Sequence, residues 1–252
     1  MIRIILGDIT EINDVDVLIN SAKKSLMGGG GVDGAIHHKA GSDLLRACKE
    51  LHGCEVGEAK ITKGFNLSVP YIIHTVGPVH YDDFWAKKHN YDQVGMLKSA
   101  YSNSLKLAKE HNLKRVAFSA IATGAYMYPI DEATKIALDT VIEFMGVNPE
   151  FEVTFVLFTE DHYGEYVKQI KDYNVEFSTT KYEIDYYSMD SMKDSVNHYR
   201  TMTKSEPIKS LKDNMNSYNS MSKSELVEDE VPVEVTKKEN AFKRILKKLK
   251  LI

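Results

Sequence analysis

A run of four glycines, Gly28–Gly31, is the segment whose residue types most directly suggest binding chemistry. It follows an apolar run that ends at Ile19 and precedes a helical pattern that begins at Val32. Glycines let the backbone turn tightly and point bare N–H groups at an anion, and the start of a helix adds partial positive charge. The run lacks the spaced glycines of a dinucleotide fingerprint, and no Gly-Lys-Ser/Thr closes it as a P-loop. It is compatible with a diphosphate-binding loop or with an ordinary flexible turn.

A second candidate phosphate loop is the segment Ala122–Pro129, which also follows an apolar run. The hydroxyl of Thr123 and the neighbouring backbone N–H groups could bind a phosphate, and Tyr126 could cover it. By itself this segment would be an ordinary connection that contains glycine and proline. Together with the four-glycine run it predicts a two-loop cradle for a diphosphate.

Strands and helices alternate around these loops. Short apolar runs are predicted strands, and they are Ile2–Leu6, Val15–Ile19, Tyr71–Val76, Arg115–Ala120 and Val153–Phe158. Segments with apolar residues at three- and four-residue spacing are predicted helices, and they are Val32–Leu51, Met96–His111 and Asp131–Phe144. This alternation predicts a layered α/β domain with a largely parallel sheet, whose ligand sites lie at the strand ends.

The composition changes toward the carboxyl end of the chain. All 15 glycines lie at or before Gly164, and the sequence is polar from residue 175 onward. We therefore expect a domain over residues 1–174 and a mostly disordered linker over residues 175–238. Residues 239–252 are predicted to form a basic amphipathic helix, because apolar residues from Ala241 to Ile252 share one face among lysines and an arginine. That helix could bind an anionic membrane surface or an acidic partner, or it could pack against the domain.

Charge and cysteine content exclude several classes of protein. The net charge of −4 and the pI near 6.2 disfavour nucleic acid as the main partner. Two cysteines, Cys48 and Cys54, and an opening sequence without a secretory leader predict a cytoplasmic location. Four histidines, His37, His38, His52 and His74, show no zinc-binding spacing and are expected to be structural. Trp85 lies in a polar insertion that could be a lid or a surface pad.

Five motifs resemble, in order and spacing, those of the macro domain family, and the likeness is closest to its mono-ADP-ribosyl hydrolases. They are Leu6–Thr10, Gly28–His37, Gly57–Phe65, Ile73–Pro78 and Ala122–Pro129. The resemblance implies a three-layer α/β/α domain with a mixed, largely parallel sheet that binds ADP-ribose without a cofactor or a metal. The ligand-binding residues that it implies are Asp8, Ile9, Asn20, Ser21, Ala22, Gly28, Gly29, Gly30, Gly31, Val32, Ala122, Thr123, Gly124, Ala125, Tyr126 and Phe158.

The resemblance also implies a role for individual residues at the adenine end of the ligand. Asp8 would accept the adenine amino group, which suits a carboxylate because it can only accept, and the Ile9 amide would be its neighbour. Phe158 would stack on the base, a contact worth about 1–3 kcal/mol. Without the resemblance, Phe158 would be assigned to the core.

At the other end of the ligand, the resemblance implies that Asp33 acts near the anomeric carbon of the distal ribose. A carboxylate there could position or deprotonate water, or stabilise positive charge on that carbon. The substrate would be an ester of ADP-ribose on a protein Asp or Glu, or O-acetyl-ADP-ribose. Without the resemblance, Asp33 is an ordinary acid in the first turn of a helix.

Lys23 departs from the family pattern, which has asparagine at this position. Asparagine donates and accepts hydrogen bonds, whereas lysine only donates and adds a charge. Lys23 could contact a phosphate or a ribose hydroxyl, or it could pair with Asp33 and disable it. The sequence therefore leaves two functions open: a hydrolase with Asp33 and Lys23 at its catalytic centre, and a non-catalytic reader of ADP-ribose.

Overall fold

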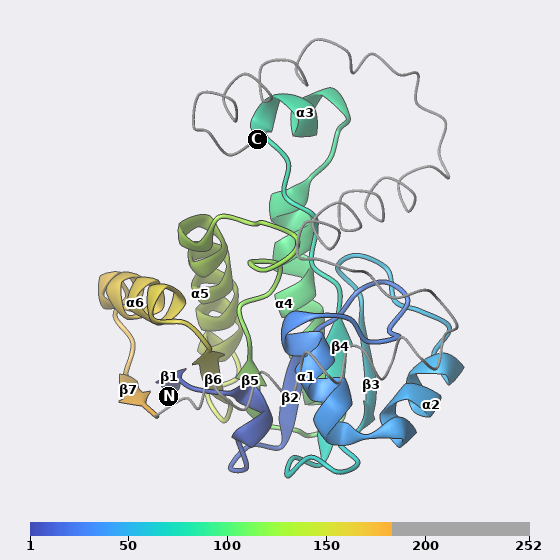
Figure 1. Cartoon of the computed structure of the whole chain (residues 1–252). Helices are drawn as coiled ribbons and strands as arrows, with labels where there is room; N and C mark the ends of the chain where they lie inside the picture. The colour runs from blue at the N-terminus through green and yellow to red at the C-terminus, as the bar shows by residue number, and fades with distance from the viewer. Residues whose placement is uncertain (183–252) are drawn as a thin grey trace, which may run out of the picture. The chain divides into compact units, whose positions relative to one another are not determined.

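One seven-stranded sheet organises the part of the chain that the computed structural model describes, residues 1–182 (Figure 1). Its strands lie in the order β3-β4-β2-β5-β6-β1-β7. Neighbouring strands are parallel except for β3 and β4, so the predicted mixed, largely parallel sheet is confirmed. The strands are β1 (Ile2–Leu6), β2 (Val17–Ser21), β3 (Ala59–Lys63), β4 (Tyr71–Thr75), β5 (Arg115–Phe118), β6 (Glu152–Leu157) and β7 (Phe177–Lys181).

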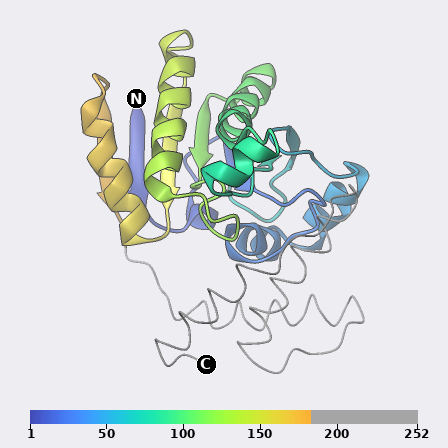
Figure 2. The same ribbon diagram turned by 90° about the horizontal axis from the view of Figure 1, so that it is seen from above.

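Helices cover both faces of this sheet, as three layers seen from above (Figure 2). Successive strand residues point to opposite faces, so Val17 and Ile19 of β2 enter one core and Leu18 enters the other. The first core is closed by α4 (Gln93–Glu110), α5 (Ile130–Gly146) and α6 (Glu160–Gln169). The second is closed by α1 (Gly31–Ala40) and α2 (Ser42–Glu50).

The predicted single helix Val32–Leu51 is in fact these two helices, α1 and α2, separated at Gly41. Gly41 has φ 85°, which a helix does not allow, and it ends α1 and begins α2. Its N–H donates to the carbonyl of His37, and its own carbonyl accepts from the N–H of Leu44. The apolar spacing continues across the break because both helices pack on the same core, and this continuity explains the wrong prediction.

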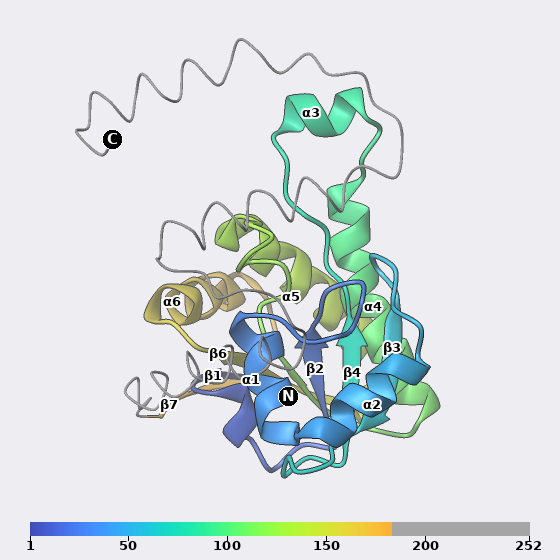
Figure 3. The same cartoon turned by 45° about the vertical axis from the view of Figure 1, so that its right-hand side comes forward.

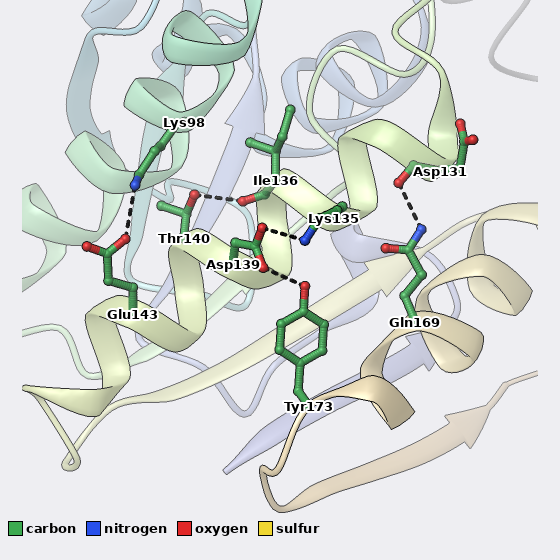
Figure 4. A network of polar contacts seen from close by, with 9 residues as sticks. All are labelled: Lys98, Asp131, Lys135, Ile136, Asp139, Thr140, Glu143, Gln169 and Tyr173. Atoms are coloured by element: carbon green, nitrogen blue, oxygen red, sulfur yellow. Dashed lines mark hydrogen bonds and ion pairs between the residues drawn. The ribbon is translucent and has the colours of Figure 1, made fainter.

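Polar contacts tie α5 to its neighbours along the solvent side (Figure 4). The Asp139 carboxylate accepts from the hydroxyl of Tyr173 at 2.6 Å and from Nζ of Lys135 at 3.0 Å. Tyr173 directly follows the short 3-10 turn η2 (Ile170–Asp172) that ends α6. Lys98 on α4 pairs with Glu143 at 3.0 Å, so α5 is held on both sides.

The segment that joins β4 to α4 carries a small helix, α3 (Asp83–Lys88), at the end of the domain where the parallel strands terminate (Figure 3). Asp82 caps it by accepting from the N–H of Trp85. The ring of Trp85 is stacked between Tyr81, at 3.9 Å between centroids, and His89, at 4.1 Å. The insertion predicted to be a lid or a surface pad is therefore an ordered aromatic stack, with Phe84 74% exposed beside it.

The expected domain boundary at residue 174 differs from the structure, because β7 forms beyond it. Residues of β7 pair in parallel with β1, from Ile2 with Phe177 to Leu6 with Lys181. Most of β7 is exposed and its sequence is polar, so backbone pairing at the sheet edge places a segment whose composition resembles a linker. The rest of the predicted linker and the predicted helix over residues 239–252 lie outside the described residues. Among the described helices, none has the length and hydropathy that a membrane crossing requires.

Candidate functional site

The four-glycine run ends the loop between β2 and α1, with Gly30 as the N-cap of α1 and Gly31 as its first residue. Gly28 has φ 74°, a left-handed conformation that favours glycine. Gly34, in the first turn of α1, lies so close to the carbonyl oxygen of Gly29 that a Cβ there would collide with it. The sequence therefore permits a compact loop whose backbone folds directly against the start of a helix. A bound anion at that position would meet the positive end of α1.

Asp33 lies in the first turn of α1, the place that the sequence predicts for it without the family resemblance. Its side chain is buried. It is 5% exposed, and its Oδ1 accepts a hydrogen bond from Nδ2 of Asn20 at 2.8 Å. Nε2 of His37, one helical turn later, lies 3.6 Å from the same oxygen. Burial raises the pKa of Asp33, and the hydrogen bond from Asn20, the His37 ring and the charge of Lys23 act in the opposite direction. A carboxylate of this kind is a stronger base than an exposed one.

His74 on β4 stands behind Asn20 and is fully buried. Its Nδ1 lies 3.1 Å from Nδ2 of Asn20, and its Nε2 lies 2.9 Å from the hydroxyl of Thr62 on β3. Burial lowers the pKa of His74 to about 3, so the ring is neutral. The sequence identified His74 only as a structural histidine. The available signal was its polar side chain inside the apolar strand Tyr71–Thr75.

Lys23 follows β2 by two residues and is partly exposed. Its charge lowers the pKa of Asp33 and the pKa of His37, which places it within electrostatic reach of both groups. A nearby cation favours the ionised form of Asp33, which is the form that can accept a proton. Lys23 and Asp33 therefore act on each other electrostatically.

The second predicted phosphate loop, Ala122–Pro129, is a tight turn after β5. The N–H of Met127 donates to the carbonyl of Gly124 at 2.9 Å, and the N–H of Tyr128 donates to the carbonyl of Ala122 at 3.1 Å. Gly124 and Ala125 at its tip are exposed, while Tyr128 is buried. The turn is thus anchored at its base and presents its tip to solvent.

The two loops follow neighbouring strands, β2 and β5. The N–H of Ala122 donates to the hydroxyl of Ser21, at the end of β2, over a long 3.5 Å. Tyr126 packs against both cores of the domain. Among residues 1–182, and apart from the adjoining backbone, no atom lies within 4 Å of a Cβ added at Gly31 or at Gly124, so the described part of the chain leaves the space in front of both glycines open. This arrangement suits a diphosphate held between two backbone loops.

Asp8 and Phe158 lie at the ends of β1 and β6, which are neighbours in the sheet. Oδ1 of Asp8 accepts from the N–H of Thr10 at 2.8 Å and so caps the 3-10 turn η1 (Ile9–Glu11). Ile9 is buried, whereas Asp8 and Phe158 are half-buried. The two predicted adenine-binding residues therefore follow the carboxyl ends of two neighbouring strands.

Both cysteines are buried and carry free thiols. Burial raises the pKa of Cys48 to about 12 and that of Cys54 to about 11, which makes them poor nucleophiles. They line a cavity of about 440 Å³ together with Lys24, Lys49 and His52. None of the predicted ligand-binding residues lines this cavity.

Comparison with known proteins identifies the same region of the chain. The model of the Macro domain family matches residues 19–137. A macro domain-containing protein of Chlorobaculum tepidum is 46% identical over 171 residues, which cover 68% of this chain and 95% of that protein. The ADP-ribose glycohydrolase MACROD2 of Xenopus laevis is 44% identical over 172 residues, 66% of this chain but 39% of the frog protein.

Solved structures agree with the sequence matches. The Oceanobacillus iheyensis macrodomain with ADP superposes with a TM-score of 0.61 at 43% identity, covering 67% of this chain and 89% of that one. The Trypanosoma brucei macrodomain in complex with ADP-ribose gives 0.61 at 37% identity, covering 67% of this chain and 68% of that one. On its fold, its motifs and these similarities, the chain belongs to the macro domain family.

Proposed function

We propose that this chain binds ADP-ribose across the carboxyl ends of β1, β6, β5 and β2. The observation that supports this most directly is a pair of backbone loops after the neighbouring strands β2 and β5, with open space among the described residues in front of Gly31 and Gly124. The diphosphate would occupy this space. The adenine would extend to Asp8 and Phe158, and the distal ribose would extend toward Lys23 and Asp33. The macrodomains of known structure that bind ADP or ADP-ribose support the same ligand.

We further propose that the domain hydrolyses mono-ADP-ribose esters, with Asp33 as the base. Water would form a bond to the anomeric carbon of the distal ribose, and the bond from that carbon to the ester oxygen would break. The electron pair of the broken bond would leave with the protein carboxylate, and Asp33 would accept the proton of the water and return it to solvent. O-acetyl-ADP-ribose is the alternative substrate of the same site. The buried, Asn20-bonded carboxylate supports this role.

Lys23 supports a second candidate function, a reader that binds ADP-ribose without turnover. Where the family pattern has an asparagine, this chain has a cation within electrostatic reach of Asp33. A cation there attracts the phosphates and the carboxylate but cannot accept a hydrogen bond from water or from a ribose hydroxyl. The same pocket would then retain ADP-ribose and leave its ester intact.

Calorimetric titration with ADP-ribose tests binding. We expect saturable binding that weakens about 5- to 150-fold in Phe158→Ala, the loss of about 1–3 kcal/mol of base stacking. Asp8→Ala should weaken it as well, because the adenine amino group loses its acceptor. Val147→Ala, at an 80% exposed residue after α5, is the control and should bind as the wild type does. Absence of binding by folded wild-type protein would refute the proposal.

An assay on an aspartyl- or glutamyl-ADP-ribosylated protein separates the hydrolase from the reader. For a hydrolase, we expect release of ADP-ribose by the wild type and a loss of about 100-fold or more in Asp33→Ala. If the wild type releases none and Lys23→Asn does, the chain is a reader. Lys24→Asn is the matched control, since Lys24 is an exposed neighbour that pairs with Glu55 at 2.9 Å.

A further inference from the structure

A line of buried polar contacts runs behind the candidate site and crosses three adjacent strands. It starts at Thr62 on β3, passes through His74 on β4 and Asn20 on β2, and ends at Asp33 on α1. Asn20 and His74 are register partners in the parallel pair β2 and β4, so their side chains leave the sheet on the same face. That is the face covered by α1 and α2. All the side chains of the line are at most 9% exposed.

The donors along this line can be assigned from Asp33. An ionised carboxylate only accepts, so the Asn20 atom that faces it must be Nδ2 rather than Oδ1. The same Nδ2 faces Nδ1 of His74, which must therefore carry a lone pair. The ring proton of the neutral His74 then lies on Nε2, from which it is donated to the hydroxyl of Thr62. The thiol of Cys48 lies 3.8 Å from the same nitrogen.

The orientation of the Asn20 amide depends on both of its neighbours. Within residues 1–182, Oδ1 of Asn20 has no hydrogen-bond partner, so no contact on that side fixes the amide. If the amide turned over, Oδ1 would face the Asp33 carboxylate and the His74 lone pair, and both contacts would be repulsive. Replacing the acceptor at His74 would remove one of the two forces that hold Nδ2 toward Asp33.

We propose that His74 is a positioning residue for Asp33, which it holds in place through the side-chain amide of Asn20. The line of contacts from Thr62 to Asp33 is called the relay below. The effect of the relay on turnover rests on the hydrolase function proposed for Asp33, but the relay itself does not depend on that function. Because His74 stays neutral throughout the neutral pH range, the relay keeps one arrangement of protons there. Asp33 is thereby presented as an oriented carboxylate although burial disfavours its charge.

Two variants of His74 each retain one of the two hydrogen-bonding positions of its ring. The side chain of asparagine places its amide oxygen where Nδ1 lies, so His74→Asn keeps the acceptor for Asn20 and loses the donor to Thr62. The side chain of glutamine places its amide nitrogen where Nε2 lies, so His74→Gln keeps the donor to Thr62 and loses the acceptor for Asn20. His38→Gln, at an exposed histidine of α1, is the control for a histidine change that leaves the relay intact.

The first measurement does not depend on activity. In nitrogen-15 spectra of the wild type, His74 should show a protonated Nε2 and an unprotonated Nδ1. In carbon-13 titrations, the pKa of Asp33 should rise in His74→Gln, because the lowering hydrogen bond from Asn20 is lost, and stay near the wild-type value in His74→Asn. A protonated Nδ1 in the wild type would overturn the proposal. This test needs no variant, so the proposal can be refuted even if the variants fail to fold.

The second measurement is turnover. We expect His74→Gln to lower kcat by up to about 100-fold, the effect of a displaced catalytic group, with KM nearly unchanged. His74→Asn should retain most of kcat. Equal losses in both variants would indicate a structural role and contradict the proposal. If the wild type has no activity but the spectra follow the expected pattern, the hydrolase function fails and the relay stands.

Discussion

The two ends of the candidate site are built in different ways. The Asp33 cluster, which consists of Asn20, Asp33, His37 and His74, is buried and draws its members from β2, α1 and β4. The Asp8 turn, which consists of Asp8, Ile9 and Thr10, is one short stretch of chain closed by a hydrogen bond over two residues. One end therefore depends on tertiary packing, and the other is made by local sequence.

This difference indicates what each end can do. A buried carboxylate held by a buried amide is oriented and has a raised pKa, which suits proton transfer. A half-buried carboxylate that caps a turn keeps one oxygen for its own backbone and leaves the other for a ligand, which suits recognition. The changes that follow should disturb the Asp33 cluster strongly and the rest of the site weakly.

The largest effect on stability is expected in acid. As the pH falls below 6.5, the ordinary pKa of histidine, His74 becomes protonated in the unfolded chain. In the folded protein it stays neutral until about pH 3. The free energy of unfolding should therefore fall by up to about 1.4 kcal/mol for each pH unit between these limits. Urea unfolding at several pH values should give a shallower pH slope for His74→Asn than for the wild type. An equal slope, or the same change in His38→Asn at the exposed site, would contradict this origin.

A paired change of two glycines should separate packing from ligand access. Gly34→Ala forces a Cβ against the carbonyl oxygen of Gly29, so we expect a loss of about 1–3 kcal/mol of stability and a displaced Asp33. Gly124→Ala adds a methyl group to open space, so stability should stay within about 0.5 kcal/mol while ADP-ribose affinity falls. Chemical denaturation and calorimetry of both variants check this. Unchanged affinity in Gly124→Ala would place the ligand elsewhere.

Removing the charge of Asp33 should stabilise the fold. Its pKa is raised above 3.8 in the folded protein, so its contribution to stability is fully present below that pH and is lost as the pH rises through the folded value. Asp33→Asn keeps an oxygen for Asn20 and cannot ionise. Its stability relative to the wild type should grow with pH, by about 1.4 kcal/mol for each unit by which the pKa is raised. Thermal unfolding of both proteins over the acid-to-neutral range measures this, and a less stable variant at neutral pH would contradict it.

The smallest effect is expected at the contact between Ser21 and Ala122. Ser21→Ala removes a hydroxyl that accepts from the N–H of Ala122 over 3.5 Å, a distance at which hydrogen bonds are weak. We expect a change in stability of less than about 0.5 kcal/mol. Denaturation curves and calorimetry test this together. A large loss of affinity would show that Ser21 contacts the ligand itself.

Much of the site could be predicted because its loops are local. Gly28–Gly31 and Ala122–Pro129 were located by glycine and by the apolar runs before them, and both follow a strand. The break at Gly41 was missed because the apolar spacing continues through it, and β7 was missed because its exposed residues are polar. Thr62 and His74 were not assigned to the site because neither lies near Asp33 in the sequence.

The sequence by itself determined the alternation of strands and helices and the two glycine-containing loops. Each of these depends on residues within a few positions of one another, where backbone preference and hydrophobic spacing decide the outcome. Only the tertiary structure decided the Asp33 cluster. Its formation requires β2 to lie beside β4 in a register that pairs Asn20 with His74, and α1 to cover that face of the sheet. Strand order and register depend on the packing of the whole core, which short segments do not specify.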